Sequence, residues 1–205
     1  MSTAPLIHVV DDDASLRTAL LRLLDAAGFE ARGYASTGDF LLQPVPDRPG
    51  CVLLDVRMPG PSGLELQAAL QSRCIALPVV FLTGHADVAS SVRAMKAGAV
   101  DFLTKPVQRH TLLDALRRAL ARDASARTAR DEAVRLRAVF ATLTLRERKV
   151  FDLIAAGKLN KQVADELGIA ERTVKMTRAQ VMAKLGAGSA AELGGLAERL
   201  RRLSI

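Results

Sequence analysis

Residues 6 to 105 alternate between strand-sized apolar runs and segments whose apolar residues recur at helical spacing, and this alternation limits the fold more than any other feature. The apolar runs are continuous, which is typical of strands buried on both faces. Strands are expected at 6–10, 30–34, 51–54, 78–82 and 100–103, and helices at 16–27, from a capping box at Ser36 and Asp39 onward, and at 63–73, 86–97 and 109–122. Five βα units in a row predict an α/β fold in which a doubly wound, five-stranded parallel sheet carries helices on both faces.

The charge is distributed unevenly along the chain. The 205 residues hold 29 Lys and Arg against 22 Asp and Glu, a formal net charge of +7. Residues 1–122 hold 13 basic and 12 acidic side chains, residues 123–138 hold 4 and 3, and residues 139–205 hold 12 and 7. The last third therefore carries +5 of the +7. This favours a polyanionic partner, above all nucleic acid, for the C-terminal part over a uniformly basic surface.

The sequence also limits the compartment and the redox chemistry. No apolar run approaches the roughly 18 residues of a membrane span, and the first 13 residues lack the pattern of a signal peptide. We therefore expect a cytoplasmic protein. The two cysteines, Cys51 and Cys74, are too few for a disulfide framework and lack the companions of a zinc site, so both are expected to be buried thiols.

After residue 122 the strand signal disappears and helical patterns replace it. Apolar residues at the spacing of a short helical seam fit a linker helix packed on its own domain and a dimer seam equally well; they are Ala126, Ala129, Ala133, Leu136 and Phe140. Three or four short helices follow. Thr144 with Glu147 caps the first, Asn160 can cap the second, the third begins at Glu171, and Ser189 with Glu192 caps the fourth; Gly157, Gly168 and Gly186 end the first three. The short turn at Gly168 predicts a helix-turn-helix. The expected domains are 1–122, a helical linker at 123–139, and 140–205.

Residues that could form a ligand site follow four of the expected strands. They are Asp11, Asp12 and Asp13 after the first, Asp55 after the third, Thr83 and Gly84 after the fourth, and Thr104, Lys105 and Pro106 after the fifth. The carboxyl ends of parallel strands meet at one edge of a sheet, where ligands bind. Clustered carboxylates repel one another unless a cation lies among them, and an all-oxygen donor set suits Mg²⁺. With a lysine and a hydroxyl to bind phosphoryl oxygens, the set predicts phosphoryl transfer onto an aspartate.

Four motifs in this order resemble the receiver domain of two-component response regulators. They are VVDDD at 9–13, LLDVRMPGPSGLE at 53–65, VVFLTGHAD at 79–87 and MKAGAVDFLTKP at 95–106. The resemblance covers about residues 1–122 and implies a flavodoxin-like receiver fold. It further implies that Asp55 accepts the phosphoryl group, that Asp12 ligates Mg²⁺ directly, and that Asp11 does so mainly through water.

The same resemblance implies roles for four further residues. The backbone carbonyl of Arg57 is expected to complete the Mg²⁺ ligands with Asp55, and Lys105 matches the invariant lysine. Thr83 matches the switch hydroxyl, and Phe102 matches the aromatic residue that changes rotamer on activation. Asp13 has no metal role in the family and is expected to cap the first helix, while His85 is expected to be a solvated loop histidine near the site.

Residues 143–186 resemble the DNA-binding domain of the LuxR/FixJ type, through the segments L-T-L-R-E, N-K-Q-V-A, L-G-I-A-E-R-T-V-K and K-L-G. The resemblance implies a recognition helix at 171–185 that enters the major groove. The family pattern places Lys175, Met176 and Ala179 toward the bases, and Arg172 shares their face by helical spacing. Phosphate contacts or caps are expected at Thr173, Arg178, Lys161 and Asn160. Thr177 stands where the family commonly has histidine, and Gly194 with Gly195 weakens the last helix, the usual dimer face.

Together the two resemblances imply a response regulator, rather than an enzyme, in which phosphorylation of Asp55 by a sensor histidine kinase controls promoter binding and transcription. Its expected partners are that kinase, double-stranded promoter DNA and a second copy when phosphorylated, with RNA polymerase a further candidate. Three other functions compete with this one. A Mg²⁺-dependent phosphatase normally needs an aspartate where Arg57 stands, and a regulator gated by a small molecule normally has an aromatic-rich pocket, whereas this chain has no Trp. The third alternative is a receiver that binds protein in place of DNA.

Overall fold

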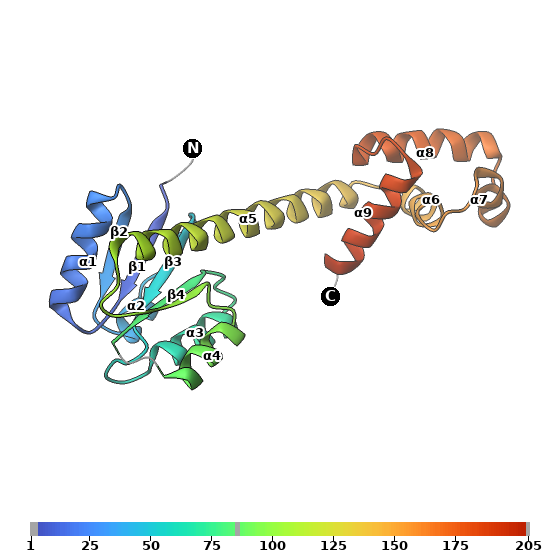
Figure 1. Ribbon diagram of the computed structural model, residues 1–205. Helices are drawn as coiled ribbons and strands as arrows, with labels where there is room; N and C mark the ends of the chain where they lie inside the picture. Colours follow the sequence, from blue (N-terminus) through green and yellow to red (C-terminus); the bar gives the residue numbers. More distant parts are fainter. Residues whose placement is uncertain (1–3, 85–86, 204–205) are drawn as a thin grey trace. The chain divides into compact units, whose positions relative to one another are not determined.

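The computed structural model describes residues 4–84 and 87–203, and the chain forms two compact units, Met1–Arg127 and Thr128–Ile205. These are called the N-terminal and C-terminal units. The N-terminal unit contains a five-stranded sheet in the order β2-β1-β3-β4-β5 (Figure 1). Its strands are β1 (Leu6–Val10), β2 (Glu30–Tyr34), β3 (Gly50–Leu54), β4 (Val79–Thr83) and β5 (Asp101–Thr104). All neighbouring pairs are parallel, which confirms the predicted doubly wound sheet.

Helices connect these strands at bounds within two residues of those expected, except at the end of the last one. They are α1 (Ala14–Ala26), α2 (Thr37–Leu42), α3 (Gly63–Ser72), α4 (Val88–Lys96) and α5 (Arg109–Ala141). Side-chain caps explain where several of them begin. Asp13 caps α1 as predicted, and Ser36 accepts the Asp39 N–H at 3.0 Å to cap α2. Ser62 and Glu65 form a complete capping box at the start of α3.

Successive strand residues pack into two different cores because side chains alternate across a sheet. Ile7 and Val9 of β1 pack with α1 and α5. Buried apolar residues of β3, β4 and β5 belong to the same core. Val10 packs instead with α2, α3 and α4 on the opposite face. Such double burial explains why the strands read as continuous apolar runs rather than alternating ones.

The C-terminal unit is helical and has its own core. Its helices are the end of α5, α6 (Leu145–Ala155), α7 (Asn160–Leu167), α8 (Glu171–Leu185) and α9 (Ala190–Leu203). Val150, Val163 and Val174 are fully buried where α6, α7 and α8 meet. Leu136 and Phe140 of α5 pack against this core, with the Phe140 and Phe151 ring centroids 5.2 Å apart. The distal part of the predicted helical seam therefore packs on its own unit.

The helix that was expected to end at residue 122 continues, and α5 is one helix of 33 residues. Asp123, which is 1% exposed, lies at the point where a boundary was expected. Its Oδ2 accepts the Gly50 N–H of β3 at 3.0 Å and an N–H from Arg127 at 2.8 Å, and Arg127 also pairs with Asp47 at 2.7 Å. A side chain that bonds both the sheet and the next turn of α5 explains why the helix continues. The domain limits 1–122, 123–139 and 140–205 stay a prediction.

Three further expectations have clear outcomes. Cys51 is buried as expected, but Cys74 is exposed, because it lies in the turn after α3 with a φ of +56°. Helix α9 runs through Gly194 and Gly195, and a Cβ on Gly194 would make only an ordinary contact of 3.6 Å with the Ala155 carbonyl, so close packing does not require that glycine. Among residues 4–84 and 87–203, none of the helices is both long and apolar enough to cross a membrane.

Candidate functional sites

The strand ends bring three of the predicted acidic residues together. Asp11 and Asp12 follow β1 and Asp55 follows β3, and each offers a carboxylate oxygen within 4.8 Å of the other two. Asp11 is 2% exposed and Asp55 8% exposed, whereas Asp12 faces solvent. Burying two carboxylates beside a third is costly unless a positive charge compensates them, so this edge of the sheet has the electrostatics of a cation site.

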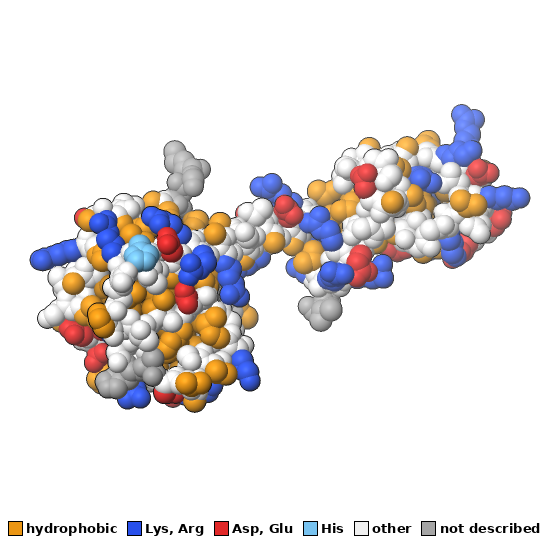
Figure 2. All heavy atoms as spheres, viewed as in Figure 1, with side chains coloured by type: hydrophobic (Ala, Val, Ile, Leu, Met, Phe, Trp, Pro, Cys, Tyr) orange, Lys and Arg blue, Asp and Glu red, His pale blue; other side chains and the backbone are white. Residues whose placement is uncertain are grey.

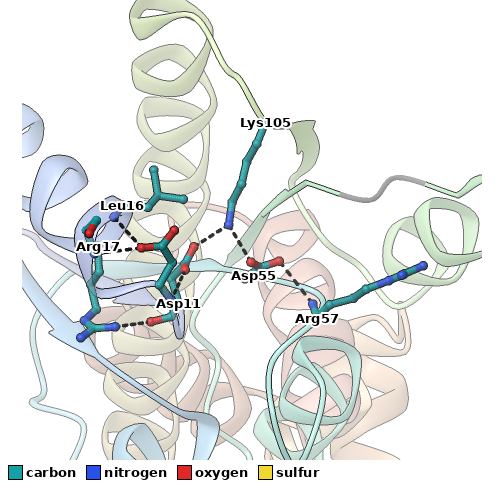
Figure 3. Close-up of polar contacts among 8 residues, drawn as sticks. Asp11, Leu16, Arg17, Asp55, Arg57 and Lys105 are labelled. Carbon is teal, nitrogen blue, oxygen red and sulfur yellow. Dashed lines mark hydrogen bonds and ion pairs between the residues drawn. The ribbon is translucent and has the colours of Figure 1, made fainter.

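Lys105 supplies positive charge from the end of β5 (Figure 3). Its Nζ donates to Asp11 Oδ2 at 2.7 Å and to Asp55 Oδ2 at 2.6 Å. Burial alone would lower the pKa of the Lys105 amine, but the hydrogen bonds and charges of the two aspartates outweigh it and raise that pKa. Burial raises the pKa of the Asp11 carboxyl, although Lys105 and the Asp13 N–H act in the opposite direction. The lysine thus holds the two buried carboxylates together.

The loop after β3 presents Asp55 by backbone contacts. Asp55 Oδ1 accepts the Arg57 N–H at 3.2 Å, while the Arg57 side chain extends away from the acidic residues (Figure 3). Gly63 explains a glycine of the receiver-like motif, because a Cβ there would lie 2.1 Å from the Asp55 carbonyl oxygen. The Gly63 N–H also donates to the Val56 carbonyl at 3.0 Å, so the start of α3 packs directly on the loop that carries Asp55. The expected role of the Arg57 carbonyl stays a prediction.

The two predicted switch residues share one face of the sheet. Thr83 ends β4 and is 1% exposed, and Phe102 is half-buried on β5. The strand register pairs Phe81 with Phe102 and Thr83 with Thr104, and the Phe81 and Phe102 ring centroids lie 5.8 Å apart. Phe102 packs with the core that includes Ala94 of α4. A movement of Thr83 or Phe102 would therefore alter the packing between this face of the sheet and α4. His85 lies outside the described residues.

Two further residues contact the acidic cluster, one predicted from the sequence and one not. Asp13 was expected as a cap, and its Oδ1 accepts the N–H groups of Ser15 and Leu16 at 2.9 and 3.1 Å, which lowers the pKa of its carboxyl. Arg17 was missed, yet its Nη1 donates to the Asp11 backbone carbonyl at 2.6 Å. The sequence indicated only its place on α1, one turn before Leu20 and two turns before Leu24, both of which lie in the core.

The second site is the exposed face of α8, which follows α7 through Gly168 in the left-handed conformation. The four residues expected on one face are all exposed; they are Arg172, Lys175, Met176 and Ala179. Met176 is 58% exposed, a large apolar side chain in contact with water. Lys175 pairs with Glu171 at 3.1 Å. Thr177 is buried and donates to the Thr173 carbonyl at 2.9 Å, so it is a core residue rather than a DNA contact.

The four residues expected as phosphate contacts or caps differ in exposure and in their contacts. Lys161 is exposed on α7, and Thr173 and Arg178 are half-buried on α8. Asn160 does not cap α7 as expected. The N-cap position belongs to Leu159, and the Asn160 Oδ1 accepts a hydrogen bond from Arg178 at 3.2 Å that ties α7 to α8. The chain thus has the two parts of a helix-turn-helix, with its basic residues on the open side of the second helix.

Comparison with known proteins yields matches for both units. The family described as "Response regulator receiver domain" matches residues 7–117, and the family described as "Bacterial regulatory proteins, luxR family" matches residues 141–197. Nodulation protein W of Bradyrhizobium diazoefficiens is 45% identical over 97% of this chain and 88% of that protein. The transcriptional regulatory protein FixJ of Azorhizobium caulinodans is 42% identical over 91% of this chain and 89% of its own length.

Solved structures give the same result. The response regulator StyR is 46% identical, with a TM-score of 0.84 over 96% of this chain and 100% of that one. Full-length FixJ from B. japonicum is 39% identical, with a TM-score of 0.59 over 98% of this chain and 99% of that one. Both family models that match are those of regulatory proteins.

Proposed function

This chain belongs to the two-component response regulators that join a receiver domain to a LuxR-type DNA-binding domain, and we propose that phosphorylation of Asp55 controls its binding to promoter DNA. The family membership implies a histidine kinase and DNA as partners. One observation carries the assignment of Asp55 above all. Its carboxylate follows β3, lies 2.6 Å from Lys105 Nζ and has an oxygen within 4.8 Å of both Asp11 and Asp12.

The residues present at this edge fit Mg²⁺. The donor set consists of carboxylate oxygens, two of them on buried side chains, and a hard cation with octahedral oxygen ligation suits such a set. Asp11, Asp12, Asp55 and the Arg57 carbonyl would hold the ion. When bound, it supplies charge neutralisation for the transferring phosphoryl group.

The reaction itself needs little from the protein beyond position and charge. A carboxylate oxygen of Asp55 forms the new bond to phosphorus while the bond between phosphorus and the donor histidine breaks. Lys105 lies 2.6 Å from Asp55 Oδ2, so it can bind a phosphoryl oxygen once the group is in place. The Thr83 hydroxyl, at the end of the neighbouring strand, is the expected hydrogen-bond donor to the acyl phosphate.

We place the response at α4. If Thr83 moves to the phosphoryl group, Phe102 gains room to turn inward, and both residues share the face that α4 covers. Helix α4 exposes an apolar stripe at helical spacing, Val88, Val92 and Met95. Figure 2 shows hydrophobic side chains gathered on the face where α3 and α4 lie. Pairing of two phosphorylated copies through this surface would bring two DNA-binding units to adjacent half-sites in the cytoplasm, where RNA polymerase is the further candidate partner.

The primary test is the acceptor itself. Asp55→Asn removes the nucleophilic oxygen and lowers the repulsion among the carboxylates, so the fold should persist while phosphorylation is lost. Intact-mass measurement after incubation with acetyl phosphate and Mg²⁺ should find one phosphoryl adduct on the wild type and on Asp114→Asn, an exposed aspartate of the same unit. An adduct on Asp55→Asn would contradict the assignment.

The dimer has a separate test. Thr83→Ala should still accept phosphate but dimerise poorly, because the hydroxyl that draws the switch inward is missing. Val92→Asp should be phosphorylated normally and stay a monomer, because it places a charge in the α4 stripe. Sedimentation velocity of the full chain with and without beryllofluoride measures both. A wild type that stays monomeric would move the response from dimerisation to release of the DNA-binding unit.

A further inference from the structure

The side chain of Arg17 passes Gly33 of the edge strand β2 and reaches residues 11–13, which are called the acidic loop. Residue 17 lies on α1 and is half-buried. A Cβ on Gly33 of β2 would lie only 3.2 Å from both Cγ and Cδ of Arg17, so the arginine stem occupies the space that a side chain at position 33 would need. This close approach fixes the direction in which the guanidinium group leaves the helix.

The guanidinium group of Arg17 binds the backbone of the acidic loop. Arg17 Nη1 donates to the Asp11 carbonyl at 2.6 Å (Figure 3). The same loop is held twice more, because the Asp13 N–H donates to Asp11 Oδ1 at 3.0 Å and Asp13 Oδ1 caps α1. Residues 11–13 are therefore fixed from the helix side before any cation binds. Each of these bonds has one charged partner, the Arg17 guanidinium or an aspartate carboxylate, which strengthens it.

We propose that Arg17 is a positioning residue for Mg²⁺, which holds the Asp11–Asp12 backbone so that both carboxylates converge on the cation. The inference rests on the Mg²⁺ site of the proposed function. Hydrogen bonds that orient ligands from behind commonly change metal affinity about tenfold or more when they are removed. The charge of Arg17 acts in the opposite direction, because a guanidinium near the site repels a divalent cation. Positioning and charge thus predict opposite signs for the same substitution.

This opposition makes the test decisive. Isothermal titration of MgCl₂ into the full chain should find that Arg17→Ala binds Mg²⁺ about tenfold more weakly than the wild type, even though a repelling charge has been removed. Arg17→Lys, which keeps the charge and a donor, should recover part of the loss. Arg22→Ala removes the same charge from an exposed position of the same helix, and its affinity should stay unchanged or rise slightly.

A second variant reaches the same contact from the other side. Gly33→Ala should push the Arg17 stem outward and weaken Mg²⁺ binding, and this effect should disappear in the Arg17→Ala background. Thermal unfolding of the metal-free proteins controls for folding, since a merely structural role would lower the midpoint and leave the affinity of the folded protein unchanged. If Arg17→Ala does not fold, Arg17→Lys takes its place, alone and combined with Gly33→Ala.

The outcomes separate the two proposals. A wild type that does not bind Mg²⁺ would overturn the metal site of the proposed function. A wild type that binds Mg²⁺, with Arg17→Ala binding equally or more tightly, would overturn the positioning role of Arg17 and leave the site intact. An equal loss from Gly33→Ala with and without Arg17 would assign the effect of that alanine to Leu21, the other neighbour of Gly33, and would count against the arginine.

Discussion

At the scale of single residues, His8 shows how burial sets a pH response. It lies within β1, is 2% exposed, and its Nδ1 is 2.9 Å from the Tyr34 hydroxyl oxygen. The Tyr34 and Phe40 rings pack against it at centroid distances of 5.7 and 5.3 Å. Burial, with the charges of Arg32 and Arg48, lowers the pKa of His8 from 6.5 to about 4. The folded protein therefore keeps this imidazole neutral where an unfolded chain would protonate it.

The sign of the resulting pH dependence follows from proton counts. Between pH 6.5 and about pH 4 the unfolded chain binds a proton at His8 that the folded chain refuses, so the free energy of unfolding falls as the pH falls through this window. The full effect is of the order of 3 kcal/mol. His8→Gln should lose this part of the pH dependence, and His110→Gln, on an exposed histidine, should keep it. Urea unfolding near pH 7 and near pH 5 measures the difference, and parallel losses in the wild type and His8→Gln would contradict the assignment.

The acidic residues and Lys105 could be predicted because each follows an apolar run, and strand ends of a parallel sheet meet. Arg17 could not, because its partner is a backbone carbonyl and its path depends on Gly33 of another strand. Cys74 is exposed in the turn after α3, where it adopts a positive φ itself. A composition rule that treats free cysteines as buried has no information about such a turn.

At the scale of elements, α5 differs most from its prediction. Its helical pattern was predicted from residue 109, but the change in residue pattern near residue 122 suggested a helix end that the structure lacks. The reason is tertiary, because Asp123 bonds a Gly50 N–H that is 73 positions away in the sequence. Helices α6 to α9 were predicted closely, since the capping box at Thr144 and the glycines that end α7 and α8 are local signals.

The Asp123 contacts predict a large difference between two aspartates of one helix. Asp123→Ala leaves the Gly50 N–H without its acceptor and Arg127 without one of its two carboxylates, and should cost about 2 to 4 kcal/mol of unfolding free energy. Asp114→Ala breaks an exposed pair with Arg117 and should cost less than about 0.5 kcal/mol. The same change at both positions in α5 cancels the gain in helix propensity. Urea unfolding followed by circular dichroism compares them, and similar costs would refute a structural role for Asp123.

At the scale of the whole molecule, the charge of the last third should appear in DNA binding. Lys175 and Lys161 are both exposed, yet they are expected to act differently, on bases and on phosphates respectively. Loss of a base contact costs about 1 to 3 kcal/mol and relaxes sequence preference, whereas loss of a phosphate contact weakens binding to all sequences and lowers the salt slope by about 1. The exposed pair of Lys175 with Glu171 is too weak to prevent this contact.

Titrations of Lys175→Ala and Lys161→Ala distinguish the two roles. Each variant is titrated with a duplex selected from a random pool and with a scrambled duplex, at several salt concentrations. Lys175→Ala should lose affinity mainly for the selected duplex, and Lys161→Ala for both. An equal loss on both duplexes would remove Lys175 from the residues that read sequence.

The buried Tyr34 has a practical consequence for observing the molecule. The chain has no Trp and a single Tyr, so all of its tyrosine fluorescence arises from one ring on β2, beside His8. Tyrosine emission then reports the unfolding of the N-terminal unit alone, while far-ultraviolet circular dichroism reports the helices of both units. Coincident curves from the two probes would indicate one cooperative transition, and separated curves would give the stability of each unit from the native sequence without any label.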